Sequence, residues 1–392
     1  MERRTILKAI LLASASTSMP VVHAAVRSSK SKAVPDSFGL NNLKSTHIKT
    51  MGISSGDKTI FNVVFIGDSW THVSNRYSGV LADYLTEKYG DAGSGWIGLG
   101  SFYSPRYFTI NGCARAKKFI VKYDNPESWT IGGYANRNTP DISVAGSNKV
   151  GAKITVFGSG PVIKYKICYQ KSNGIFKYKV SGSEWVTIDA SKSSTDISFH
   201  ERECKFDGSW NIEFVVVSGE CLIGGIMTYT GNSGVIVNKL GSTGSTTRDW
   251  AEKDRGSWVF GMEEMSPDLV TILLGTNDQS IPLTVDEYSR NVLKIISRVR
   301  EVNDDCDILL IAPCENARKG NKIPMRKYAK ALYEIAKLKK IGFLNLQPVF
   351  GETPSHYDMD SRLPLIGPDK IHPIENTGGR LIAYTIKEAL GV

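Results

Sequence analysis

Residues 60–70 read IFNVVFIGDSW, an apolar run that stops abruptly at Gly67, Asp68 and Ser69. A near-continuous apolar run of this length is typical of a strand that is buried on both faces of a parallel sheet. Asp68 or Ser69 would then cap the helix that follows. Alternatively, Ser69 is held at the edge of the sheet as a nucleophile that attacks a carbonyl carbon. Partner residues elsewhere in the chain must decide between these interpretations.

Strands and helices alternate on both sides of a long central segment. An amphipathic helix over 77–90 follows the first strand and ends at Gly90, a favourable C-terminal cap. The remaining elements come late in the chain, with strands expected over 268–278, 306–314 and 342–350 and helices over 285–302, 325–341 and 378–390. This rhythm predicts an α/β domain, formed by 58–100 together with 231–392, whose parallel sheet is covered by helices on both faces.

The central segment, residues 101–230, has a different pattern. Short runs of alternating apolar and polar residues are separated by Gly, Ser and Asn, as in GAKITVFG, VIKYKICYQ and WNIEFVVVSG. This pattern predicts a β-sandwich inserted into the α/β domain. Residues 26–57 are rich in Ser, Lys and Asn and are expected to form a linker.

The N-terminus has the features of an export signal. Residues 1–25 combine Arg3 and Arg4, a short apolar stretch and a small-residue cleavage site at 22–24. They fit either a twin-arginine signal or an ordinary secretory signal. Both predict a periplasmic or secreted protein. Because no other long apolar segment occurs, we expect no stable membrane insertion after the leader is removed.

The charge balance is basic, with 48 Lys and Arg against 39 Asp and Glu and a formal net charge of +9. A basic surface suits an anionic polymer or a membrane face, but it also fits an ordinary solvated surface. We expect no nucleic-acid partner, because no dense Lys/Arg block with interleaved aromatic residues occurs. The sequence does not indicate an oligomeric state.

The six cysteines fit an oxidising compartment, but their pairing cannot be read from the sequence. Cys306 and Cys314 bracket an expected strand, so they would lie roughly 26 Å apart and cannot bond to each other. The other four are free to pair among themselves: Cys113, Cys168, Cys204 and Cys221. No C-x-x-C occurs, which argues against a zinc or redox site.

Residues suited to acyl transfer follow the expected strands. Ser69 follows the first strand, Asn277 follows another, and Asp369 lies three residues before His372. The Asp-x-x-His spacing lets a short turn bring the carboxylate to one ring nitrogen, which leaves the other nitrogen as a base. Each feature alone has an ordinary interpretation as a cap or a turn. Four other histidines could serve as the base in place of His372: His47, His72, His200 and His356.

Four short blocks resemble, in order, the four sequence blocks of the SGNH (GDSL-type) hydrolases: GDSW (67–70), GSTGSTT (241–247), GTND (275–278) and DKIH (369–372). The resemblance implies a flavodoxin-like, three-layer fold. It also implies a catalytic triad of Ser69, His372 and Asp369, and an oxyanion hole formed by Ser69, Gly244 and Asn277. No metal and no organic cofactor is expected.

One residue of the first block departs from the usual pattern, and the second block contains two glycines that could be the oxyanion-hole residue. Trp70 replaces the residue more common after GDS and is expected to narrow the pocket beside the nucleophile. Gly241 and Gly244 both lie within the second block, and Gly244 is preferred because it directly precedes the Ser-Thr-Thr stretch.

The segment YGDAGSGW (89–96), followed by a β insert, is similar to the periplasmic peptidoglycan O-acetylesterases, whose insert resembles a carbohydrate-binding module. Five aromatic residues of this insert either stack on sugars or form its core: Trp129, Tyr134, Tyr178, Trp185 and Trp210. We therefore expect a serine esterase that removes O-acetyl groups from peptidoglycan or from an exopolysaccharide such as cellulose. The alternatives are a polysaccharide O-acetyltransferase that uses the same triad, a lipid or aryl esterase, and a non-enzymatic polysaccharide-binding component.

Overall fold

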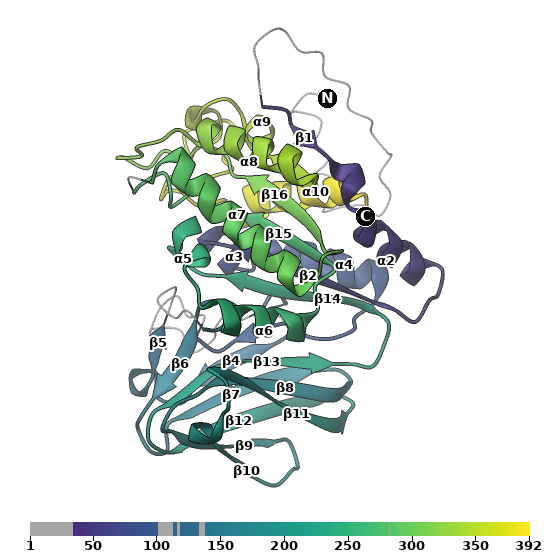
Figure 1. The fold of residues 1–392 in the computed structure, drawn as a ribbon, viewed down its shortest axis with the longest axis vertical. Coiled ribbons are helices and arrows are strands. Elements are labelled where there is room, and N and C mark those ends of the chain that lie inside the picture. The colour runs from purple at the N-terminus through teal and green to yellow at the C-terminus, as the bar shows by residue number, and fades with distance from the viewer. Residues whose placement is uncertain (1–33, 101–112, 116–117, 133–137, 282) are drawn as a thin grey trace.

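A computed structural model shows an α/β body with a β module below it (Figure 1). The structure describes residues 34–100, 113–115, 118–132, 138–281 and 283–392. The expected signal peptide, 1–25, lies outside the described residues.

The α/β body is built on one six-stranded sheet. In spatial order its strands are β1 (Ser37–Phe38), β17 (Gly342–Asn345), β16 (Asp307–Ala312), β15 (Leu269–Leu273), β2 (Ile60–Gly67) and β14 (Gly234–Gly241). The last five are mutually parallel, and β1 pairs antiparallel with β17. Counted along the chain, the parallel strands have the order 2-1-3-4-5, which is the flavodoxin-like order. The predicted three-layer α/β fold is confirmed.

Side chains of the central strand β2 alternate between two cores, as the pleat of a strand requires. Val64 and Ile66 enter a core shared with the helices α6, α7 and α8, whereas Val63 and Phe65 enter a core shared with α4, α9 and α10. The helices of the first face are α6 (Arg255–Met265), α7 (Val285–Val302) and α8 (Met325–Lys339). Those of the second are α4 (Ser78–Tyr89), α9 (Gln347–Phe350) and α10 (Arg380–Leu390). Burial on both faces explains why β2 is apolar almost throughout.

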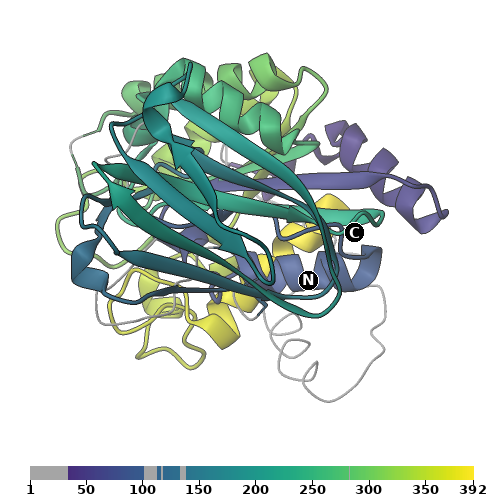
Figure 2. The same ribbon diagram turned by 90° about the horizontal axis from the view of Figure 1, so that it is seen from below.

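The β module consists of two antiparallel sheets that enclose a core of their own (Figure 2). One sheet contains β10 (Val186–Asp189), β9 (Ile175–Val180), β12 (Ser209–Ser218), β7 (Lys153–Ser159) and β4 (Ile120–Tyr123). The other contains β11 (Ile197–Phe206), β8 (Val162–Gln170), β13 (Cys221–Tyr229), β6 (Val144–Ser147) and β5 (Thr130–Gly132), with β3 (Ile97–Gly98) paired to β13. The inserted β-sandwich is therefore present, and its strands run from β3 to β13.

The module packs directly on α6. Lys253 Nζ and Trp258 Nε1, which flank the start of this helix, both donate hydrogen bonds to the Pro140 carbonyl oxygen, at 2.7 and 3.2 Å. Lys253 also lies over the ring of Trp250, 4.1 Å from its centre. This buried contact, together with an apolar core that continues from α6 into β8 and β13, joins the two bodies.

The prediction that residues 26–57 form a linker is wrong for residues 34–57, the part of this segment that the structure describes. Residues 34–57 form β1, the short η1 (Leu40–Asn42) and the helix α2 (Lys44–Ser54). The Thr46 N–H donates to Asp307 Oδ2 at 2.6 Å, and Thr46 and Thr50 are the buried residues of α2. Ile53 of α2 packs against the core, but Ile48 and Met51 are exposed, so the helix has no continuous apolar face. Its sequence therefore lacks the hydrophobic periodicity that identifies most helices.

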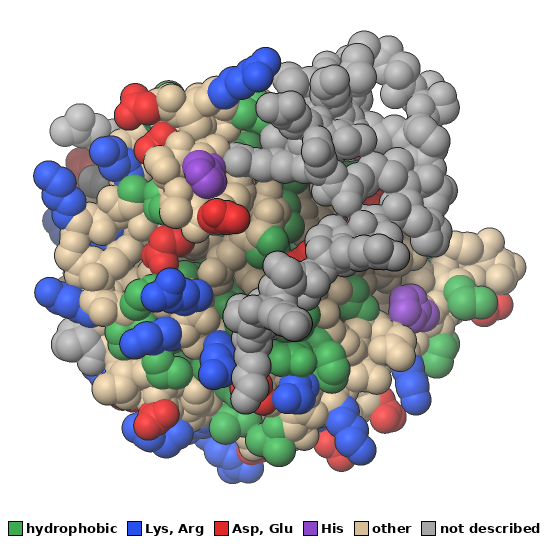
Figure 3. All heavy atoms as spheres, turned by 90° about the horizontal axis from the view of Figure 1, so that it is seen from above, with side chains coloured by type: hydrophobic (Ala, Val, Ile, Leu, Met, Phe, Trp, Pro, Cys, Tyr) green, Lys and Arg blue, Asp and Glu red, His purple; other side chains and the backbone are tan. Residues whose placement is uncertain are grey.

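All six cysteines are free thiols, so the pairing considered among Cys113, Cys168, Cys204 and Cys221 does not occur in this structure. Among the described residues, no helix is long and apolar enough to cross a membrane. On the face seen in Figure 3, Lys and Arg side chains lie among acidic ones, which fits an ordinary solvated surface.

Candidate active site

The nucleophile candidate lies where the strand order of the sheet reverses. β2 has β14 on one side and β15 on the other, and the connections from these neighbouring strands leave in opposite directions. In open α/β sheets this point, at the carboxyl ends of the strands, forms the crevice in which ligands bind. Ser69 follows the end of β2, and Asn277 follows the end of β15. The fold therefore brings the first and third blocks to one edge of the sheet.

The small residues after β2 are explained by close packing. A Cβ atom on Gly67 would lie 2.0 Å from Thr71 Oγ1 and 2.8 Å from the Leu273 carbonyl oxygen. Asp68 caps the short helix α3 (Ser69–His72) by accepting a hydrogen bond from the Trp70 N–H at 2.9 Å. Asp68 is therefore the cap, and Ser69, the candidate nucleophile, is the first residue of the helix.

Ser69, His372 and Asp369 form a continuous chain of hydrogen bonds. Ser69 Oγ lies 2.7 Å from His372 Nε2, and His372 Nδ1 lies 2.6 Å from Asp369 Oδ2. Ser69 is buried, with 3% of its surface exposed. This is the geometry of a nucleophile, a base and a group that orients the base.

The loop that carries the histidine is held by its own main chain. Asp369 Oδ1 accepts hydrogen bonds from the N–H groups of Ile371 and His372, both at 2.9 Å. The Gly367 N–H donates to the His372 carbonyl oxygen at 2.8 Å, and Lys370 adopts a left-handed conformation with φ of 61°. One carboxylate therefore fixes both the turn and the orientation of the imidazole ring.

The electrostatic environment favours a neutral histidine and a charged aspartate. Burial lowers the pKa of His372 below its ordinary value, and the positive charge of Arg76 lowers it further. Burial alone would raise the pKa of Asp369, but the N–H groups of His372 and Ile371 lower it overall. At neutral pH the imidazole is therefore free to accept a proton, and the carboxylate holds the proton on Nδ1.

Candidate oxyanion donors are present, although their roles remain predictions. Among the described residues, neither the Ser69 nor the Gly244 N–H has a hydrogen-bond acceptor. Gly244 has φ of 83°, a conformation that favours glycine. Asn277 Nδ2 donates to the Ser245 carbonyl oxygen at 3.0 Å, which ties the third block to the second.

Gly241, the other glycine considered, has a packing role. A Cβ atom at this position would lie 2.3 Å from the His72 nitrogen, so its absence lets β14 approach α3. The rival His72 is also structural. Its Nδ1 lies 3.0 Å from the Gly241 carbonyl oxygen, and burial, with Lys239 nearby, lowers its pKa to about 3.

Two arginines were missed by the sequence analysis. Arg76 Nη1 donates to the Ser69 carbonyl oxygen, and Arg318 donates to Ser280 Oγ at 2.9 Å and to Asn277 Oδ1 at 3.5 Å. Both guanidinium groups lower the pKa of His372. Neither belongs to a recognised block, so no sequence signal marks them.

A buried carboxylate also links the second and third blocks. Asp278 Oδ1 accepts hydrogen bonds from the Thr247 N–H and Oγ1, at 3.0 and 2.5 Å. Burial raises the pKa of Asp278 to about 6 and that of the neighbouring Asp68 to about 7. By accepting these hydrogen bonds, the Asp278 and Asp68 carboxylates hold the loops that surround the site in place.

The structure decides between core and surface for most of the aromatic residues considered, and it shows that the expectation for Trp70 is wrong. Trp70 is fully buried and packs near Phe350, so it does not narrow the pocket beside Ser69. Trp129, Tyr178 and Trp210 belong to the core of the β module. Trp185 is exposed, but Lys177 and Lys179 lie over its ring, each 4.7 Å from the centre. Tyr134 lies outside the described residues. Among the described residues, no group of three or more His, Cys, Asp or Glu is placed to hold a metal ion.

Comparison with known proteins bears on the family and the fold. Residues 227–376 match the model of the GDSL-like lipase/acylhydrolase family. The structure of a peptidoglycan O-acetylesterase superposes with a TM-score of 0.71 at 15% sequence identity, covering 91% of this chain and 98% of that one. Residues 227–376 are therefore similar to the GDSL-like lipase/acylhydrolase (SGNH) family, and the chain as a whole shares the fold of the peptidoglycan O-acetylesterase, including the β module.

Other solved structures match less closely. A GDSL-like lipase from Parabacteroides merdae covers 41% of this chain and 73% of its own, with a TM-score of 0.33 at 20% identity. A family two carbohydrate esterase from Clostridium thermocellum covers 69% of this chain and 98% of its own, with a TM-score of 0.29 at 13% identity. No curated protein matches the sequence.

Proposed function

We propose that this protein is a serine esterase that removes O-acetyl groups from a cell-wall or extracellular polysaccharide, with peptidoglycan as the first candidate. The observation that carries the proposal is the hydrogen-bonded chain from Ser69 Oγ through His372 to Asp369. The likeness in fold to a peptidoglycan O-acetylesterase, including the β module, supports the choice of substrate. The features of residues 1–25 support export to the periplasm or beyond, where such polymers occur.

In the first half of the reaction, Ser69 Oγ attacks the ester carbonyl carbon while His372 Nε2 accepts the hydroxyl proton. The negative charge on the carbonyl oxygen is met by the N–H groups of Ser69 and Gly244 and by the Asn277 amide. The intermediate then collapses. The bond from the acyl carbon to the sugar oxygen breaks, and His372 gives its proton to that oxygen.

In the second half, a water molecule attacks the acetyl group on Ser69, and His372 accepts the water proton. Collapse of this intermediate breaks the bond to Ser69 Oγ, releases acetate and returns the proton to the serine. Asp369 stays ionised throughout and stabilises the imidazolium that forms twice in the cycle. If a sugar hydroxyl takes the place of water, the same residues transfer the acetyl group.

The test is acetate release from a panel of acetylated peptidoglycan, acetylated cellulose and acetylated xylan. We expect release by the wild-type protein, with peptidoglycan preferred, and no release by Ser69→Ala. Equal rates for the two proteins would refute the proposal. Repeating the assay with a non-acetylated acceptor glycan separates the two outcomes, because hydrolysis yields acetate and transfer yields acetylated acceptor.

A further inference from the structure

The two segments that carry the nucleophile and the base meet a second time, beyond the triad itself. From Ser69 the chain runs through α3 to Arg76, and from His372 it runs to Gly379, directly before α10. A Cβ atom on Gly379 would lie only 1.6 Å from the Arg76 carbonyl oxygen. The main chains of the two segments are therefore in direct contact at this point.

Conformational freedom does not explain the glycine at position 379. Its φ of −64° and ψ of −44° are helical angles that any residue adopts, and a glycine inside a helix costs about 1 kcal/mol relative to alanine. The preceding Gly378 is also tightly packed, since a Cβ atom there would lie 2.0 Å from the Leu365 carbonyl oxygen. The glycine at position 379 is therefore explained by the close approach of Arg76, because a side chain would push the two segments apart.

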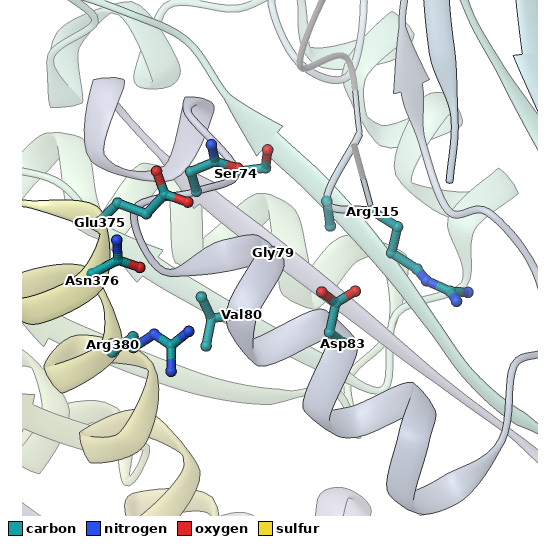
Figure 4. Close-up of a pocket in the computed structure, with 10 residues that line it drawn as sticks. Ser74, Gly79, Val80, Asp83, Arg115, Glu375, Asn376 and Arg380 are labelled. Carbon is teal, nitrogen blue, oxygen red and sulfur yellow. The ribbon is translucent and has the colours of Figure 1, made fainter. Parts of the chain in front are cut away.

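The turn that precedes α10 brings Gly379 to this contact. The turn η5 (Glu375–Gly379) is π-helical, and the Gly379 N–H donates to the Ile374 carbonyl oxygen at 2.8 Å. Turns of this kind are rare and occur frequently at functional sites. Figure 4 shows the turn beside the segment that follows α3, with Glu375 and Asn376 close to Ser74.

Arg76 connects the contact to the nucleophile. Its Nη1 donates to the Ser69 carbonyl oxygen, and its main-chain N–H donates to the Val73 carbonyl oxygen at 3.0 Å. The residue is thus tied to the first residue of α3 and to the residue that follows this helix. Its side chain holds the helix of the nucleophile, while its main chain touches the segment of the base.

The triad has little tolerance for a change at this junction. Ser69 Oγ and His372 Nε2 are 2.7 Å apart. A methyl group on Gly379 reaches an ordinary van der Waals distance from Arg76 only after a shift on the order of 1–2 Å. A shift of that size between the two segments takes the serine and the histidine out of hydrogen-bonding range.

We propose that Gly379 and Arg76 are positioning residues that set the separation between the nucleophile and the base. The inference rests on the proposed function, because it concerns the triad that performs that reaction. Gly379 acts through its main-chain contact, and Arg76 acts through its hydrogen bond to Ser69.

The experiment measures how fast a fluorophosphonate labels Ser69 at about pH 8. Ser69 Oγ forms a bond to phosphorus, fluoride leaves, and His372 accepts the hydroxyl proton. The final extent of labelling counts the folded sites, whereas the rate constant reports how well the histidine activates the serine. A purely structural role would change the extent and the melting temperature but not the rate constant.

We expect Gly379→Ala to be labelled about 10²-fold more slowly than the wild-type protein but to the same final extent, because a misplacement of about 1 Å costs roughly that factor. Arg76→Gln removes the side-chain link without a steric clash and should be labelled roughly tenfold more slowly. If Gly379→Ala does not fold, Arg76→Gln alone decides.

The matched control is Gly174→Ala, in the β module directly before β9. A Cβ atom at this position would lie 2.1 Å from the Glu220 carbonyl oxygen, so the variant meets a similar clash outside the triad segments. It should lower the melting temperature and still be labelled at the wild-type rate. Equal slowing in Gly174→Ala, or labelling of the deciding variant within twofold of the wild-type rate, overturns the inference.

Acetate release from the polymers tests the proposed function separately. Slow labelling of the two variants without acetate release from any polymer supports the positioning role and refutes the esterase proposal. Acetate release by the wild-type protein, combined with wild-type labelling rates in both variants, has the opposite meaning. If wild-type Ser69 is not labelled at all, both proposals fail.

Discussion

Replacing Asp369 by asparagine tests the role of the carboxylate while almost preserving its shape. In the native loop, Oδ1 accepts two main-chain N–H groups and Oδ2 faces His372 Nδ1 at 2.6 Å. If the amide oxygen of Asn keeps the two N–H groups, its NH2 group must face Nδ1. The ring then adopts the other tautomer, with the proton on Nε2, where it faces Ser69 and cannot accept the hydroxyl proton.

The opposite orientation of the amide is no better, because its NH2 group would then face two N–H donors. We expect kcat for an aryl acetate to fall about 10³–10⁴-fold, the loss typical of a triad whose tautomer is wrong. This loss corresponds to about 4–5 kcal/mol of transition-state stabilisation. The half-exposed carboxylate, with 48% of its side chain accessible, lets water replace part of the interaction and favours the lower figure.

The assay is steady-state hydrolysis of p-nitrophenyl acetate, with circular dichroism to check folding. Asp360→Asn, an exposed substitution in the neighbouring loop, serves as the control and should retain full activity. If Asp369→Asn keeps more than a tenth of the wild-type kcat, the carboxylate does not set the tautomer and the reasoning fails.

Three further predictions follow from contacts around the triad. Because the pKa of His372 is lowered and the base must be neutral, kcat/KM should fall only as the pH drops through an apparent pKa below 6.5. Arg76→Gln removes a positive charge near His372, so the acidic limb of its pH–rate profile should lie at higher pH than that of the wild-type protein. Arg318→Gln loosens the hold on Asn277 Oδ1 and should lower kcat roughly three- to tenfold with little change in KM, whereas a purely structural role would lower the melting temperature instead. Gly67→Ala forces a methyl group against Thr71 and the Leu273 carbonyl and should destabilise the fold by about 3 kcal/mol in urea unfolding. Gly256→Ala, where the new methyl group would make only an ordinary contact with Asp254 Oδ1 at 3.6 Å, should be neutral or slightly stabilising.

The sequence predicted the α/β body well because its signals are local. β2 reads as a buried strand since both of its faces are covered, and Gly67 is small because α3 and β15 leave no room for a side chain. Ser69, Asp369 and His372 were found because each occupies a short block with fixed spacing, and the structure joins them by two hydrogen bonds.

Other features escaped because no short motif or hydrophobic periodicity marks the residues that make their contacts. α2 is held by the Asp307 carboxylate and not by an apolar stripe. Arg76 and Arg318 reach the site from loops of ordinary composition. The aromatic residues of the insert could not be assigned to core or surface, because in a two-sheet module the sequence alone does not say which face of each strand meets the other sheet.

The most direct test of the account is to trap the acyl-enzyme. The wild-type protein is mixed with p-nitrophenyl acetate, quenched in acid within the burst phase and digested, and the peptides are analysed by mass spectrometry. The account predicts an acetyl group on the peptide that contains Ser69, absent in His372→Ala quenched at the same time. An acetyl group on a different residue, or sustained turnover by Ser69→Ala, would contradict it.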